Sequence, residues 1–177
     1  MGGIPVNQKR YAEKSPYWAT TVNPYKSQAE IMVQLEAFGA TNTMLAQGQA
    51  GGQLAWMVRF EHQGIAHRFT FVPLECEHSE RTSSFGGTRR SHADQARYQM
   101  GRTAAHFVKA ILTAAESQPH ALFGFVELPE AGFHPGGLPV TAGELDVEGL
   151  TAALPQLVVG QPTFRMLADE VPSREEH

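Results

Sequence analysis

The stretch LAWMVRFEHQGIAHRFTFVPL, residues 54–74, decides the fold of this chain. Apolar side chains recur at every second position in both halves of the stretch, from Leu54 to Phe60 and, with His67 in the series, from Ile65 to Phe71. Such period-two alternation is typical of strands with one buried face. A Gln-Gly pair between the two runs suits a tight turn, so the stretch predicts an antiparallel hairpin.

A two-residue turn places Arg59 directly opposite Arg68 on the polar face of this hairpin. Like charges that face each other across two strands destabilise a sheet, so both guanidinium groups need a negative partner. A bound anion such as a nucleic-acid phosphate would suit them, because arginine donates two parallel hydrogen bonds to phosphate. The alternative is a solvated face on which Arg59 pairs with Glu61, Glu75 or Glu77.

A helix is expected before the hairpin. Ser27 and Glu30 have the spacing of a capping box, and Gly39 suits the residue that follows a helix. Between them, one face carries the apolar residues Ile31, Leu35 and Phe38. A short strand over residues 41–47 is expected to follow and to join the hairpin in one sheet.

A second, longer helix is expected after a loop that covers residues 75–92. Ser91 is its predicted N-cap, with Asp94 three residues later, and the helix is expected to reach about Glu116. Arg97 falls near the apolar face, where it can snorkel or pair with an acid. The apolar face consists of Met100, Ala104, Phe107, Val108 and Ile111, and a polar face consists of Tyr98, Arg102, His106 and Lys109.

Three parts are expected along the chain. Residues 1–26 read as an irregular arm, broken by prolines, whose aromatic residues dock on their own domain or on a neighbouring subunit. Residues 27–128 form an α+β core with an antiparallel sheet of three to four strands and the long helix packed on one sheet face; a last strand is expected within 121–128. Residues 129–177 read as a loop-rich acidic region with a short helix over 146–154.

Charge is distributed unevenly along a chain whose net charge is −4. Residues 1–109 carry twelve Lys and Arg against eight Asp and Glu, whereas residues 110–177 carry two against ten. The segment from Arg81 to Lys109 alone holds six cations and one acid. This asymmetry favours a basic working surface and an acidic C-terminal part, and an acidic tail that only aids solubility is the alternative for the latter.

Several classes of protein fit the sequence poorly. No apolar run approaches the roughly 18 residues of a membrane span, and the first residues contain no apolar signal region. Cys76 is the single cysteine, which excludes an internal disulfide and a cysteine-rich zinc site. No histidine pair has zinc-binding spacing, and no nucleophile-elbow or phosphate-loop motif is present. We therefore expect a cytoplasmic protein without a membrane anchor, metal, cofactor or enzymatic activity.

Four stretches carry a resemblance to a known group of proteins: Ser27–Ala40, Met57–Pro73, Arg89–Lys109 and Val126–Pro129. In their order of helix, strands, arginine-bearing loop, long helix and Leu-Pro turn they resemble a family of uncharacterised phage and prophage proteins. The resemblance implies a setting in mobile elements or genome maintenance and no particular activity. A hairpin-containing sheet followed by a long helix is also similar, more loosely, to the core of Rad52-type single-strand annealing proteins, which implies single-stranded DNA as a ligand.

The sequence thus predicts a nucleic-acid-binding protein, with single-stranded DNA in repair or recombination as the leading ligand and setting. We also expect a homo-oligomer, because an exposed sheet edge recruits another chain. The alternative is a protein-interaction or assembly module of phage or prophage type that binds no nucleic acid. The predicted phosphate-binding residues are Arg59, Arg68, Arg81, Arg89, Arg90, Arg97, Arg102 and Lys109.

Overall fold

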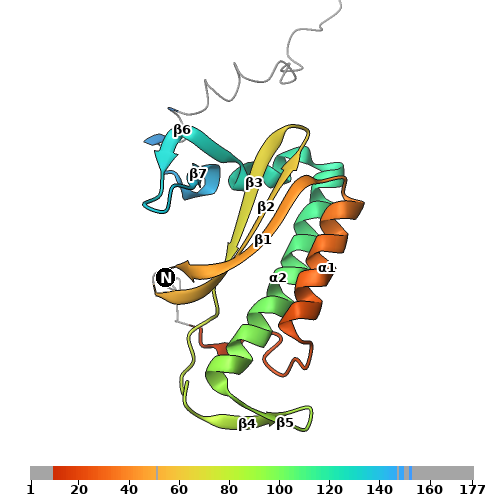
Figure 1. Cartoon of the computed structure of the whole chain (residues 1–177), viewed down its shortest axis with the longest axis vertical. Coiled ribbons are helices and arrows are strands. Elements are labelled where there is room, and N and C mark those ends of the chain that lie inside the picture. The colour runs from red at the N-terminus through yellow and green to blue at the C-terminus, as the bar shows by residue number, and fades with distance from the viewer. Residues whose placement is uncertain (1–9, 51, 147, 150–151, 153–177) are drawn as a thin grey trace, which may run out of the picture.

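The computed structural model describes residues 10–50, 52–146, 148–149 and 152, and its largest unit is one sheet covered by two helices (Figure 1). The sheet is antiparallel, with the strand order β1-β2-β3. Its strands are β1 (Thr41–Ala50), β2 (Gln53–His62) and β3 (Ile65–Phe71), and the helices are α1 (Pro24–Ala37) and α2 (His92–Ser117). The α+β class and the packing of the long helix on one sheet face are confirmed.

Smaller elements surround this unit. One two-stranded hairpin lies at the N-terminal end of α2, and another lies across the sheet from the helices (Figure 1). The first hairpin consists of β4 (Thr82–Phe85) and β5 (Thr88–Ser91), and the second of β6 (Glu127–Phe133) and β7 (Pro139–Thr141). Three 3-10 turns complete the described chain: η1 (Ala12–Lys14), η2 (Pro119–Phe125) and η3 (Ala142–Glu144).

The predicted β2–β3 hairpin forms with the predicted register. Gln63 has a φ of 52° and Gly64 a φ of 79°, which is the two-residue turn whose twist matches that of the flanking strands. His62 therefore pairs with Ile65, and Arg59 lies opposite Arg68.

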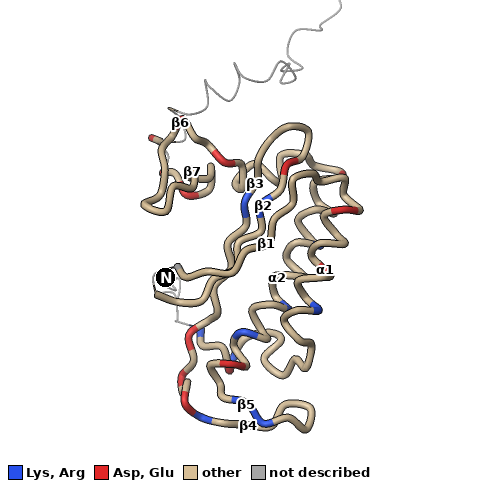
Figure 2. Tube along the Cα trace, viewed as in Figure 1, with Lys and Arg blue, Asp and Glu red and all other residues tan. Residues whose placement is uncertain are grey.

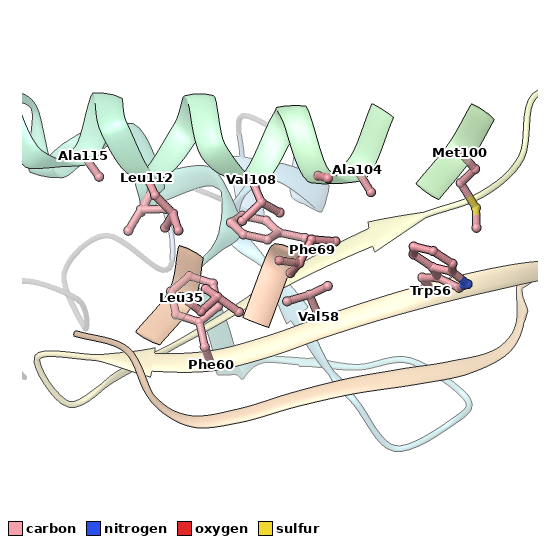
Figure 3. Packing of buried hydrophobic residues seen from close by; sticks show 13 residues of the cluster. Leu35, Trp56, Val58, Phe60, Phe69, Met100, Ala104, Val108, Leu112 and Ala115 are labelled. Atoms are coloured by element: carbon pink, nitrogen blue, oxygen red, sulfur yellow. The ribbon is translucent and has the colours of Figure 1, made fainter. Parts of the chain in front are cut away.

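The core lies between the sheet and the two helices (Figure 3). Trp56, Val58, Phe60 and Phe69 point from the sheet towards α2, and none of them is more than 2% exposed. They meet Met100, Ala104, Val108 and Leu112 of α2 and Ile31 and Leu35 of α1. Because a fully buried side chain of this size contributes roughly 2–3 kcal/mol, this layer dominates the stability of the fold and confirms both predicted helical stripes.

The start of α1 differs from the prediction. The helix begins at Pro24, and Asn23 caps it by accepting a hydrogen bond from the backbone N–H of Tyr25 at 2.9 Å. Ser27, the predicted N-cap, is buried inside the helix, so that prediction is wrong. Asn23 followed by Pro24 is the stronger start signal, because asparagine caps well and proline already has the helical φ of the first turn.

The region predicted as one loop over 75–92 contains the β4–β5 hairpin, so a featureless loop is wrong there. Gly86 and Gly87 both have positive φ and form its turn. The predicted N-cap of α2 is confirmed, since Ser91 Oγ accepts the backbone N–H of Asp94 at 3.1 Å.

The segment after α2 also differs from the prediction. Residues 119–125 form η2 where a strand over 121–128 was the expectation, and β6 starts only at Glu127. The loop expected over 129–143 contains the rest of β6 and all of β7. Only three residue pairs join β6 to β7, and an irregularity separates the third from the other two, so the hairpin has too little regular alternation to be recognised in a sequence. The helix expected over 146–154 lies for the most part outside the described residues, as does the rest of the C-terminal region.

The N-terminal arm docks on its own domain through two buried glutamines of α2. The amide of Gln99 donates to the backbone carbonyls of Ala12, Ser15 and Pro16, and the amide of Gln95, one turn earlier, donates to those of Trp18 and Thr20. Backbone carbonyls that face a helix need such donors, because a buried polar group without a partner is costly. Of the two docking modes that the sequence left open, the structure therefore shows the one within the same chain for residues 12–20.

Gly101 provides the first test of this packing. A Cβ at this position would lie 2.8 Å from the ring of Trp56 and 3.5 Å from the Cα of Pro24. Alanine favours a helix by about 1 kcal/mol over glycine, but overlap in a packed core costs typically 1–3 kcal/mol. We expect Gly101→Ala to lower the free energy of unfolding by about 1 kcal/mol in urea titrations. Gly48→Ala, whose Cβ meets no atom within 4 Å, is the control and should be neutral.

Candidate nucleic-acid interface

Arg59 and Arg68 lie under the β6–β7 hairpin on the face of the sheet that points away from the helices. Arg59 Nη2 lies 2.7 Å from Glu127 Oε2, and Arg68 Nη2 lies 3.0 Å from Glu144 Oε2. Only 3% of the Arg68 side chain and 1% of the Glu127 side chain are exposed, whereas 40% of the Arg59 side chain is exposed. Carboxylates of the chain itself thus occupy the place that the sequence assigned to a bound anion.

The carboxylate of Glu144 is held in its ionised form by this arrangement. Burial opposes ionisation of Glu144, but the backbone N–H of Thr141, the ring of His134 and the charge of Arg68 outweigh it and lower the pKa of Glu144. The sequence suggested two kinds of partner for these arginines: a bound anion, or Glu61, Glu75 or Glu77 for Arg59. The structure instead pairs Arg59 with Glu127 and Arg68 with Glu144. The partners are residues 127 and 144, which lie 59 to 76 positions further along the chain than the arginines they neutralise.

A second group of predicted residues gathers at the other end of the molecule, on β4–β5 and the first turns of α2 (Figure 2). Arg81 and Arg89 are exposed. Arg90 lies over the ring of Tyr98 at 3.9 Å and donates to Gln95, and Arg97 pairs with Asp94 at 3.2 Å. Phe85, the aromatic residue of the β4–β5 hairpin, is 7% exposed and packs edge-on against Trp18, so it offers no face to a nucleic-acid base.

The third group lines a groove of about 470 Å³ on the outer side of the two helices. Lys26 contributes from α1, and Arg102 and Lys109 contribute from α2. Glu30, the one acid among the described lining residues, pairs with Arg102. The groove keeps an excess of positive charge. Of its apolar lining residues, Ala105 is buried and forms the floor, whereas Ala29 and Val33 are exposed.

An aromatic ring packs against one of the residues that line this groove. Tyr17 stacks on His106, a lining residue, with 4.8 Å between ring centroids and an interplanar angle of 4°. Tyr17 is 41% exposed, and Tyr25, next to Lys26 in the chain, is 74% exposed. Basic side chains along a groove with accessible aromatic faces are the usual solution for binding single-stranded nucleic acid.

The eight predicted phosphate-binding residues therefore do not share one surface. The sheet pair faces away from the helices, four arginines lie around β4–β5, and Arg102 and Lys109 lie in the helix groove. Lys26, Tyr17 and Tyr25 are absent from the predicted set because all three fall in the segment predicted to be an irregular arm. The spacing of Lys26, Ala29, Glu30 and Val33 at i, i+3, i+4 and i+7 is a helical signal that was readable from Asn23-Pro24 onwards.

A separate cavity of about 610 Å³ lies where the ends of α1 and α2 meet the β2–β3 turn and η2. His67 lines it and is 4% exposed. Burial lowers the pKa of His67 to about 4, and the neighbouring His62 adds to this effect while the hydrogen bond to the Ile65 carbonyl opposes it. His67 is therefore neutral in the folded protein at neutral pH.

This burial predicts a pH-dependent stability. The unfolded chain protonates His67 near its ordinary pKa of 6.5, whereas the folded chain does so only near 4. The unfolded state thus binds more protons between these values, and stability is complete above pH 6.5 and falls as the pH drops towards 4. We expect urea unfolding to show a loss of roughly 2 kcal/mol between pH 7.5 and 4.5 that His67→Phe does not show. His120→Phe, at an exposed lining position, should keep the loss; equal behaviour of both variants would contradict the assignment.

Within the described ranges, no three His, Cys, Asp or Glu residues come together in a way that could hold a metal ion. None of the described helices has the length and apolar character needed to cross a bilayer.

Comparison of the chain with models of known families, with curated proteins and with solved structures found no match. The resemblance to phage and prophage proteins stays a prediction, and a function has to be proposed from the geometry.

Proposed function

We propose that this protein binds single-stranded nucleic acid, with single-stranded DNA as the leading ligand, along the groove between α1 and α2. The observation that carries the proposal is a groove lined by Lys26, Arg102 and Lys109 with exposed rings near it. The ring of Tyr17 stacks on the lining residue His106, and Tyr25 directly precedes Lys26 in the chain. The cations attract the phosphates, and the rings provide faces for unpaired bases. A role in DNA repair or recombination is part of the same proposal.

The shape and lining of the groove favour binding of a single strand over binding of a duplex. Arg102 and Lys109 are seven residues apart on α2, which corresponds to about 10 Å along the helix axis, and both line the groove beside an apolar floor. A duplex presents phosphates outside and stacked bases inside, so it leaves that floor and the tyrosine rings unused. A single strand uses the charged rim, the floor and the rings together.

The β4–β5 arginines extend the same proposal as a weaker, peripheral site. Arg81 and Arg89 are exposed, but the ring of Phe85 beside them is buried, so this end offers charge without a stacking face. Arg59 and Arg68 are not included, because Glu127 and Glu144 already neutralise them.

Fluorescence anisotropy with a labelled oligothymidylate tests the proposal. We expect saturable binding at low salt and a fall of log K with log salt whose slope is about −2, as three phosphate contacts on a single strand require. A duplex of the same length should bind less tightly. No binding at low salt would overturn the proposal and leave the protein-interaction module as the remaining function.

We further propose that the chain forms a homo-oligomer through β1. In the order β1-β2-β3, β1 is an edge strand, and Met44 on it is 41% exposed. An edge of this length readily pairs with a second copy. Light scattering of the full chain, with and without the oligonucleotide, should give a mass above that of one 19.4 kDa chain in both cases. A monomer in both would exclude the oligomer without touching the nucleic-acid proposal.

A further inference from the structure

Three side chains from distant parts of the sequence meet beside the β4–β5 hairpin. Glu13 lies on η1, Ser83 on β4, and His92 is the first residue of α2. His92 Nδ1 lies 2.9 Å from Glu13 Oε1, and His92 Nε2 lies 3.0 Å from Ser83 Oγ. The imidazole therefore connects a carboxylate on one side to a hydroxyl on the other.

The carboxylate sets the direction of these hydrogen bonds. Burial opposes ionisation of Glu13, but the backbone N–H groups of Glu77 and His78 and the ring of His92 outweigh it and lower the pKa of Glu13 to about 2. An ionised Glu13 accepts a hydrogen bond from Nδ1–H of His92. The lone pair of Nε2 is then left to accept the hydroxyl hydrogen of Ser83.

The surroundings hold this arrangement in place. The edge of Trp18 packs against the His92 ring with 5.1 Å between centroids, Phe85 lies on another side, and 6% of the His92 side chain is exposed. Ser83 itself is only partly buried, so the residue is not sealed off from solvent. A base that is oriented by an acid and shielded from water is what an activated serine requires.

A cation stands next to the serine. Arg90 is the cross-strand partner of Ser83, which places both side chains on the same face with Cβ atoms about 5 Å apart. Its guanidinium group is held over Tyr98 and by Gln95 Oε1, and it has further N–H groups to donate. A fixed cation at this position stabilises negative charge that develops on an oxygen beside Ser83.

We propose that Ser83, His92 and Glu13 form a catalytic triad that hydrolyses small carboxylic esters, with Arg90 facing the carbonyl oxygen. Ser83 Oγ bonds to the carbonyl carbon while its proton moves to His92 Nε2 and the carbonyl electron pair moves to the oxygen. When the electron pair on that oxygen re-forms the carbonyl double bond, the bond from the acyl carbon to the alcohol oxygen breaks. The departing alcohol takes the proton from Nε2. Water then bonds to the acyl carbon and gives a proton to Nε2, and Ser83 Oγ leaves with that proton, which releases a carboxylic acid.

Labelling of the full chain with a fluorophosphonate probe tests this triad. We expect one covalent adduct, found by peptide mass spectrometry on Ser83, together with turnover of p-nitrophenyl acetate at pH 7.5. Ser83→Ala should abolish both, and Glu13→Gln should slow labelling by about 10-fold or more, because the imidazole loses its orienting partner. Ser84→Ala is the matched control, since Ser84 is the exposed neighbour on the same strand and should keep both activities.

Two results would overturn the triad. One is an unaltered chain that takes up no probe, and the other is an adduct on a residue other than Ser83. Both are read on the unaltered chain, so the decision does not depend on whether a variant folds. Oligonucleotide binding at the helix groove is a separate measurement, and neither proposal requires the other.

Discussion

Glu127→Ala should destabilise the protein by about 3–4 kcal/mol, the largest stability loss that we expect from a single substitution here. The Glu127 carboxylate lies between Arg59 and Arg68, and 1% of its side chain is exposed. Its removal leaves two like charges directly opposite each other on neighbouring strands. Arg68 then keeps only Glu144, which is 42% exposed and less effective as a partner.

Urea unfolding followed by circular dichroism measures this loss. Glu130→Ala removes the same kind of side chain from an exposed position on the same strand, β6, and should change the stability by less than about 0.5 kcal/mol. Similar losses in the two variants would show that β6–β7 contributes through its backbone and not through the buried carboxylate.

Reversing two charges in the helix groove should weaken oligonucleotide binding by about 100-fold at low salt. In the double variant Lys26→Glu with Lys109→Glu, each substitution removes one attractive contact and adds a repulsive one. Both side chains are exposed and line the groove, so the fold should be kept, which a thermal melt checks.

The double variant Arg81→Glu with Arg89→Glu is the matched control. It makes the same change in net charge on the exposed β4–β5 hairpin and should weaken binding less than 10-fold. Equal losses in both double variants would mean that net charge alone attracts the nucleic acid, and a larger loss in the control would place the site on the hairpin.

The central hairpin could be predicted from the sequence because its signals are local. Alternation and a Gln-Gly turn determine the register, and the register alone brings Arg59 opposite Arg68. The two helical stripes and the Ser91 cap are local in the same way. These elements include most of the hydrophobic core.

The partners of those arginines could not be predicted, because they depend on contacts between distant segments. Glu127 reaches the sheet through β6, and Glu144 through the turn that follows β7. Only three residue pairs join β6 to β7, with an irregularity between them, so this hairpin leaves no regular alternation in the sequence. The same holds for Glu13 and His92, which are 79 positions apart, and for Gln99, whose role depends on where the arm docks. A polar residue on a helix reads as solvent-exposed unless its partner is known.

Photo-crosslinking tests most directly whether a single strand lies in the groove between α1 and α2. An oligonucleotide that carries 5-iodouracil is bound at low salt, irradiated and mapped by peptide mass spectrometry. We expect adducts on Tyr17, whose exposed ring stacks on His106 of the groove, and on Tyr25, the exposed neighbour of Lys26 in the chain. Fewer adducts should form when the groove charges are reversed. Adducts confined to β4–β5 or to the sheet, or none from an oligonucleotide that binds, would contradict the proposed interface.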